Sequence, residues 1–385
     1  MFSLYKFNDR SVFLTHFDLT LNNSLYFFFS PVLSKSSKNY INSSQSSLKI
    51  KNLSYDDSFL SGVGYKNSWV YFQIGKDSES WGAGRNIQIA LSSSSSSYDY
   101  LMLGSDYGRI RVKYIHALLE EINQENRYLN ARGIEWTNKK SFLIGLSEII
   151  IYSGKNRPLD IAYLNPLSSH LEVDLNNRAS FLNGNAVWQL STDLMIENKI
   201  RLSFNLLYDE FILDKVQKEE GKENGKAFSL RLVYNLDDFF HSSNFNIFFS
   251  MIHIGTPTFR HLKGTNNFVQ KGNPLGWHLG SDGDDISFGS YYGKKVFSFE
   301  SKIGVRRVGD ESILFRPYDS YKDYIKGSYP SGEFKSIIYL DTNFQLHFKK
   351  VGSVFISTDY TKADMKTKLN SFSLGLMINL TKINR

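Results

Sequence analysis

Several segments of this chain alternate strictly between two kinds of side chain. In residues 186–196 one face of an extended chain carries mainly apolar side chains and the other face carries polar ones. The first face holds Trp188, Leu190, Thr192, Leu194 and Ile196, and the second holds Gln189, Ser191 and Asp193. The same period of two recurs at 199–209, 227–236, 337–348 and 371–380. This period is typical of β-strands, so we predict an all-β fold.

The alternating segments are also long. Each has about ten residues or more, which matches the ~9–11 residues that cross a bilayer as a tilted strand, whereas strands of soluble sandwiches commonly have ~5–6. Their polar faces carry Asp193, Arg201 and Asn205 in mid-strand, as suits the wet interior of a membrane barrel. The mean hydropathy of −0.31 agrees with this, because a barrel presents apolar side chains only at every second position.

Short and long connections alternate between the expected strands. The short ones are at 138–140, 197–199, 293–295 and 350–352. The long ones are at 154–184, 214–226, 255–284 and 309–333. Outer-membrane barrels combine short periplasmic turns with long extracellular loops. We therefore predict a single antiparallel transmembrane β-barrel of about 14–18 strands.

The pattern is weaker before residue 127. Strands are plausible at 11–20, 24–32, 47–55, 66–75 and 108–118. We expect residues 1–64 to form a divergent or truncated N-terminal segment with possible first strands, and residues 65–385 to form the barrel. The first residues lack a basic stretch followed by an apolar core, so we expect the sequence to be truncated there relative to a secreted precursor.

Composition and motifs exclude several classes of function. The chain has no cysteine, which rules out disulfides and thiolate metal sites. Its net charge of +7 is spread over the strands, so we expect no nucleic-acid partner and an affinity for anionic polysaccharide or lipopolysaccharide phosphate. Known hydrolase motifs are missing, so we predict no catalytic residues, no cofactor and no enzymatic activity. Glu148 is interpreted as a lumen-facing acid paired with an arginine.

The stretch "WGAGRN" at 81–86 superficially suggests a phosphate-binding loop. A nucleotide site would require a third glycine or a Gly-Lys-Ser/Thr ending, and a helix after the glycines. Arg85 and Asn86 follow Gly84 instead, and the later serines are poor helix formers. We therefore interpret 81–84 as a constricted bend or a plug, in which glycines allow backbones to approach closely.

The order of several motifs resembles the capsule assembly Wzi family over about residues 65–380. The motifs are "WGAGRN…IALS" (81–92), "NRYLNARGIEW" (126–136), "GLSEIIIYSG" (145–154), "AYLNPL" (162–167) and "NPLGWHLGSDGDDISFG" (273–289). The resemblance implies a non-catalytic β-barrel of the Gram-negative outer membrane that binds and retains capsular or other surface polysaccharide. It also implies contact with outer-membrane lipid and lipopolysaccharide, and leaves the oligomeric state open. The alternative is an outer-membrane porin or solute channel, which an open lumen would favour.

The candidate sugar contacts follow from that resemblance. A sugar site needs a flat apolar face and a few placed polar groups. Such groups occur on two expected loops and at the glycine bend: Trp277, His278, Asp282, Asp284, Asp285, Tyr163, Asn165 and Trp81. Structural packing is the alternative for Trp81, and a loop folded into the lumen is the alternative for Tyr163 and Asn165. The aspartates lack the spacing of a calcium loop, so we predict no metal site.

Overall fold

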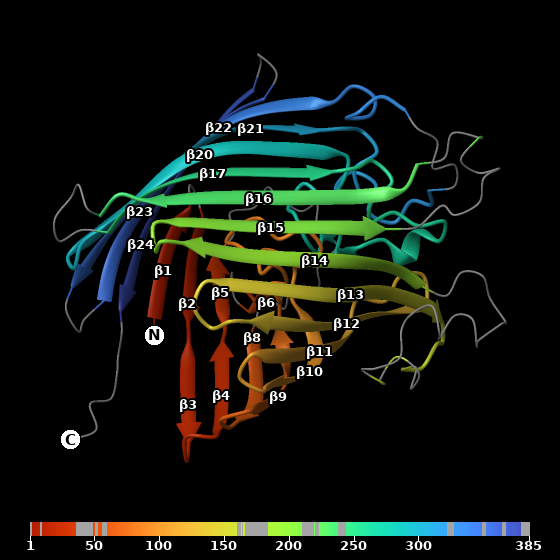
Figure 1. Cartoon of the computed structure of the whole chain (residues 1–385), viewed down its shortest axis with the longest axis horizontal. Coiled ribbons are helices and arrows are strands. Elements are labelled where there is room, and N and C mark those ends of the chain that lie inside the picture. The colour runs from red at the N-terminus through yellow and green to blue at the C-terminus, as the bar shows by residue number, and fades with distance from the viewer. Residues whose placement is uncertain are drawn as a thin grey trace.

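The structure is a computed structural model in which the chain forms one large antiparallel sheet. It describes residues 2–7, 10–35, 49–50, 53–55, 60–159, 163, 165, 184–209, 219, 223–237, 244–321, 327–348, 352–363 and 367–378. Most of the sheet is a meander in which each strand pairs with the next one along the chain, and Figure 1 shows these strands side by side.

The strands of the meander run from β8 to β24, with a separate small hairpin between β17 and β20. Their bounds are β8 (Leu60–Lys66), β9 (Val70–Asp77), β10 (Tyr98–Asp106), β11 (Ile110–Leu118), β12 (Glu125–Thr137), β13 (Phe142–Lys155), β14 (Gly184–Ile196), β15 (Ile200–Asp209), β16 (Gly225–Asn235), β17 (Asn244–Ile254), β20 (Gly283–Gly293), β21 (Phe297–Val308), β22 (Lys335–Phe348), β23 (Gly352–Ala363) and β24 (Thr367–Ile378). The hairpin is β18 (Val269–Gln270) with β19 (Asn273–Pro274), preceded by the 3-10 helix η2 (Gly264–Asn266).

The N-terminal strands are short and interrupted. They are β1 (Phe2–Phe7), β2 (Arg10–Thr15), β3 (Phe17–Leu21), β4 (Leu25–Ser30), β5 (Val32–Lys35), β6 (Lys49–Ile50) and β7 (Leu53–Tyr55). Only His16 separates β2 from β3, and only Pro31, which lacks a backbone donor, separates β4 from β5. β2 pairs with β5, and β3 pairs with β4. The consecutive strands β2 and β3 therefore act as one strand of the sheet, and β4 and β5 act as the strand beside it. In the same way β7 and β8 pair with β5 and β4.

The strand pairings close into a ring. β1 pairs with β24 on one side and with β2 on the other, which joins the end of the meander to its beginning. With each interrupted couple counted once and β6 left out, the described residues form a barrel of 18 strands. The predicted antiparallel barrel is confirmed, and its strand number lies within the predicted range. The proposed division of the chain at residue 65 stays a prediction.

The expected alternation separates an inner face from an outer face. Gln189, Ser191 and Asn205 point inward, as predicted, and they are buried rather than in contact with a wet lumen. The outer face carries large exposed apolar side chains, among them Leu232, Tyr234, Ile286, Phe288, Ile303, Val305, Ile338 and Leu340. Such a wall is stable against lipid rather than water.

Short and long connections lie at opposite ends of the barrel. The turn between β14 and β15 is at the left of Figure 1, and the long connection that contains η2 is at the right. This arrangement confirms the predicted short turns and long loops. Among the described residues, no helix is long and apolar enough to cross a membrane.

The main hydrophobic core lies inside the barrel. It joins the inner face of the wall, including Ile149 and Val187, to two connections that fold inward at 78–97 and 255–282. The two connections also bind each other, because Trp277 N donates to Ile89 O at 3.1 Å and Ser92 N donates to Leu275 O at 2.8 Å. Loops therefore fill the middle of the lumen with packed apolar side chains.

Candidate functional site

The glycine-rich stretch forms a strap across the lumen, defined here as residues 81–91. Trp81 N donates to Leu91 O at 3.2 Å and closes the strap at its base. Gly82 and Gly84 have φ values of 114° and 78°, a left-handed backbone that glycine adopts without strain. A Cβ on Gly82 would lie 2.7 Å from Gln189 Nε2 and 2.8 Å from Asn205 Oδ1, so the strap touches the wall there. The plug interpretation of this stretch is confirmed.

Polar side chains of the inner wall hold the strap. Asn205 on β15 exchanges two hydrogen bonds with the backbone of Ala83, and Ser229 Oγ on β16 donates to Ile87 O at 2.7 Å. Because Asn205 and Ser229 are fully buried, these hydrogen bonds satisfy backbone groups that cannot reach bulk water.

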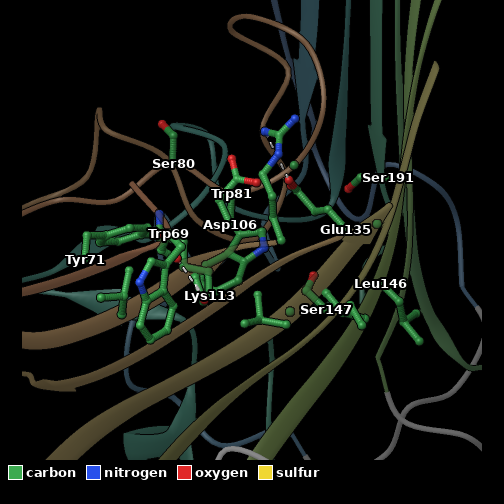
Figure 2. A pocket seen from close by; sticks show the side chains of 18 of the residues that line it. Trp69, Tyr71, Ser80, Trp81, Asp106, Lys113, Glu135, Leu146, Ser147 and Ser191 are labelled. Carbon is green, nitrogen blue, oxygen red and sulfur yellow. Dashed lines mark hydrogen bonds and ion pairs between the residues drawn. The ribbon is translucent and has the colours of Figure 1, made fainter. Parts of the chain in front are cut away.

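A cavity of about 400 Å³ lies between the strap and the short turn at 67–69. Figure 2 shows Trp81 and Lys113 in its middle, with Trp69 and Tyr71 on one side and Glu135 and Ser191 on the other. Aromatic, charged and hydroxyl side chains all line it. We call this space the aromatic pocket.

Two glycines of the wall make room for the aromatic rings of this pocket. A Cβ on Gly133 would lie 2.9 Å from Trp81 Cζ2, and one on Gly104 would lie 2.0 Å from the Tyr71 ring. Lys113 Nζ is 5.2 Å from the centroid of the Trp81 ring and 2.7 Å from Glu79 Oε2. Trp81 is only 7% exposed, so it serves mainly as packing.

A second cavity of about 550 Å³ continues from the aromatic pocket along the same end of the lumen. The two share Gly82, Arg111 and Glu135 in their linings, and we call the combined space the short-turn groove. The second cavity also has a charged lining: Lys139, Lys140, Asp193 and Arg201. The groove therefore offers aromatic faces at one end and cations at the other.

The charges of the groove are only partly balanced. Arg201 Nη2 lies 2.9 Å from Asp193 Oδ2, and Arg111 Nη1 lies 3.7 Å from Glu135 Oε2. Lys139 and Lys140 on the β12–β13 turn form no ion pair with any residue that the structure describes. An anionic ligand would gain from this excess positive charge inside a cleft with low-dielectric walls.

The predicted residues Trp277 and His278 lie in different environments. Trp277 is buried in the central core, whereas the side chain of His278 is exposed to the interior of the barrel. Desolvation by the surrounding wall, together with Arg306 and Lys302, lowers the pKa of His278 to about 3. The imidazole is therefore neutral at physiological pH.

The three predicted aspartates do not converge on one site. Asp282 is fully buried and accepts from Thr256 Oγ1 at 2.7 Å and from the backbone and hydroxyl of Ser331. Asp284 and Asp285 are successive strand residues and so lie on opposite faces of β20. Asp284 pairs with Arg307 at 2.5 Å, and Asp285 with Arg306 at 2.9 Å. These contacts give each carboxylate a structural partner, and their role in sugar binding stays a prediction.

Tyr163 and Asn165 lie against the outer wall, so the alternative of a loop folded into the lumen does not apply to these two residues. Tyr163 O accepts from Tyr114 OH at 3.0 Å and from Asn130 Nδ2 at 2.9 Å. Asn165 O accepts from Arg132 Nη1 at 3.1 Å. The donors are polar side chains on the outer face, and these carbonyls satisfy them. Sugar binding by the two residues remains a prediction.

Glu148 has the predicted arginine partner but not the predicted position. It pairs with Arg132 at 2.5 Å, and both side chains are 10% exposed. Its register partner Trp188 belongs to the outward set of β14, because the neighbouring Val187 lies in the central core. Register partners share a face, so the pair is on the outer wall and not in the lumen.

Among the residues of the groove, sequence reasoning proposed only Trp81 as a sugar contact, and it placed Ser191, Asp193 and Arg201 on the polar faces of their strands. It did not single out the other aromatic and charged residues of the lining: Trp69, Tyr71, Arg111, Lys113, Glu135, Lys139 and Lys140. A signal was present, because "RIRVKY" at 109–114 sets Arg111 and Lys113 on the polar face of a strand. Within the described ranges, no group of three or more His, Cys, Asp or Glu side chains is placed to hold a metal ion.

Comparisons with known proteins support the architecture. No protein-family model matches the chain, and no curated protein matches it. Among solved structures, it is similar to Wzi of Escherichia coli, described as an outer-membrane protein involved in group 1 capsule assembly and a carbohydrate-binding β-barrel. That similarity has a TM-score of 0.69 at 11% identity, over 99% of this chain and 84% of Wzi.

Porins share the same architecture. A BenF-like porin from Pseudomonas fluorescens is similar with a TM-score of 0.54 at 7% identity, over 98% of this chain and 96% of the porin. OccK10 of Pseudomonas aeruginosa has a TM-score of 0.50 at 9% identity, over 99% of this chain and 97% of that one. Taken together with the closed ring of strands, these likenesses establish that the chain has the fold of outer-membrane β-barrel proteins.

Proposed function

We propose that this protein is a non-catalytic outer-membrane barrel that binds and retains a surface polysaccharide, such as a capsular one. The filled lumen is the observation that carries this proposal. A solute channel needs a continuous wet path lined by polar groups. In this barrel the strap and the 255–282 connection instead pack a hydrophobic core across the middle of the lumen.

The remaining support comes from the wall and from a fold relative. The exposed apolar outer face suits insertion into outer-membrane lipid, with lipopolysaccharide as the expected neighbour on the long-loop side. Wzi, which has the same fold, is described as carbohydrate-binding. Aromatic faces combined with a few charged and hydroxyl groups, as in the aromatic pocket, are the usual chemistry of a sugar site.

A channel is the second candidate, favoured by the charged groove at one end and by the porin folds. Conductance and glycan retention should be measured on the same purified protein in planar bilayers and on immobilised capsular polysaccharides. We expect little steady conductance and clear retention of polysaccharide. Large steady conductance with no retained polysaccharide would refute the proposal and favour the channel.

A further inference from the structure

We propose that the short-turn groove is a binding site for a negatively charged oligosaccharide that enters from the periplasmic end of the barrel. This inference rests on the proposed function and specifies a site and a ligand charge for it. The sequence placed the candidate sugar contacts mainly on long loops, whereas the groove lies at the opposite mouth. A chain held there would be engaged before or during its passage to the surface.

The groove has the size of a ligand site. Its two parts measure about 400 and about 550 Å³, and both fall within the ~300–1,000 Å³ typical of small-molecule pockets. They meet at Gly82 and Arg111, so one ligand can extend from the first part into the second. This shape suits a short chain of sugar rings better than a single compact molecule.

The aromatic end supplies the stacking surface. Trp69 is 51% exposed and Tyr71 is partly exposed, whereas Trp81 is almost completely covered. Figure 2 shows Trp69 and Tyr71 close together at the same side of the pocket. A rigid, accessible indole loses little conformational entropy when it stacks on the C–H face of a sugar. Trp69 is therefore the stacking residue, and Trp81 supports the pocket from behind.

The other end selects for charge. Cations exceed carboxylates in the lining of the second cavity, with Arg111, Lys139, Lys140 and Arg201 against Glu135 and Asp193. Lys139 and Lys140 have no ion-pair partner within the part of the chain that the structure describes. Carboxylates on a sugar chain would supply the missing negative charge at this end.

The test uses oligogalacturonides and their methyl esters, which share the same rings but differ in charge. Binding to the purified full-length protein should be followed by calorimetry at low and high salt. We expect the charged oligosaccharide to bind more tightly than the ester, with an affinity that falls as salt rises. Equal affinity for the two ligands would overturn the proposal.

Two variants separate charge from stacking. K139Q/K140Q should weaken binding of the charged ligand about tenfold and leave the ester unchanged, since each exposed pairing is worth ~0.5–1 kcal/mol. Trp69→Ala should lower the affinity for both ligands by a similar factor, because stacking does not depend on charge. K294Q/K295Q removes two lysines from another short turn, outside the groove, and should leave both affinities unchanged. An equal loss in this control variant would show non-specific attraction and overturn the proposal.

The outcomes also distinguish this inference from the proposed function. If capsular polysaccharide is retained equally by the unchanged protein, K139Q/K140Q and Trp69→Ala, the groove is not the site but the protein still binds polysaccharide. If neither polysaccharide nor oligogalacturonide binds, both proposals fail. Binding of oligogalacturonide that both groove variants weaken supports the site directly.

Discussion

The side chain of Asn205 binds the backbone of Ala83 as a second peptide group would. Ala83 N donates to Asn205 Oδ1 at 2.7 Å, and Asn205 Nδ2 donates to Ala83 O at 2.9 Å. The two residues are 122 positions apart, one on the strap and the other in mid-strand on β15. This reciprocal pair fixes the glycine-containing part of the strap, where Gly82 and Gly84 offer no side chain for packing, to the wall of the barrel.

Asn205→Leu is expected to release the strap. Leucine resembles asparagine in size but leaves the buried N–H and C=O of Ala83 without partners, at a cost of about 2 kcal/mol or more. That cost corresponds to a roughly 30-fold larger population of barrels with a displaced strap. Planar-bilayer recordings should therefore show conductance steps that the unchanged protein lacks.

Gln345→Met is the matched control for that experiment. Gln345 is on β22 and donates to Ser353 Oγ of the next strand at 2.7 Å. The substitution removes a polar group from the wall without touching the strap. Recordings in which both variants behave alike would mean that other contacts hold the strap.

The wall of the barrel could be predicted from the sequence, and the plug only in part. Alternation fixes the face of each residue in a strand, so the inward position of Gln189 and Ser191 followed from the pattern alone. The path of a connection is not periodic, and it depends on distant partners such as Asn205. For this reason the glycines suggested a close approach, while the surface that they approach became visible only in the structure.

Gly133→Ala is expected to destabilise the barrel by overfilling the space beside Trp81. The added methyl group would lie 2.9 Å from the indole and 3.2 Å from Ser147 Cβ. Overpacking of this kind costs ~1–3 kcal/mol. Urea unfolding in lipid vesicles should show the loss, and Trp81→Leu in the same chain should restore part of it.

Gly327→Ala tests whether the effect is local. A Cβ at Gly327 would meet no atom of the described residues within 4 Å, so this substitution should change the unfolding free energy by less than about 0.5 kcal/mol. A similar loss in both variants would argue that glycine-to-alanine changes act here through the backbone rather than through the indole.

The polar side chains of Asn130, Arg132 and Glu148 on the outer wall could not be placed from the sequence. Polar residues in a barrel strand normally face the lumen, and this rule gave Glu148 its expected position. The actual position depends on the segment that carries Tyr163 and Asn165, whose carbonyls satisfy Asn130 and Arg132 on the outer wall. A pattern of period two does not reveal that Tyr163 and Asn165 lie against the outer face of these strands.

Asp282→Ala is expected to loosen the long loops while leaving the barrel intact. Asp282 joins the 255–282 connection to the 309–334 connection by accepting from Ser331 N at 3.0 Å and from Glu311 N at 3.2 Å. Without the carboxylate these donors lose their partner, so limited proteolysis should cut 309–334 faster. Asp282→Asn should be milder, because it keeps one acceptor oxygen and tolerates the φ of 55°. Equal cutting rates in all three proteins would contradict this role.

Arg132 and Glu148 form a buried ion pair on the outer wall. For such a pair, removing one partner is expected to destabilise the protein much more than replacing both partners. Removing one partner, as in Glu148→Leu, leaves an uncompensated buried charge and should cost ~3–5 kcal/mol of unfolding free energy. Replacing both, as in Arg132→Met with Glu148→Leu, should recover most of that loss, since lipid and apolar side chains favour each other there. A double-mutant cycle by urea unfolding in vesicles measures the coupling.

The exposed pair of Arg201 and Asp193 is the control, for which Asp193→Asn should cost at most ~1 kcal/mol. If the double replacement is as unstable as the single one, the pair instead holds the Tyr163 segment in place, and its loss should then expose Asn130 and Tyr114.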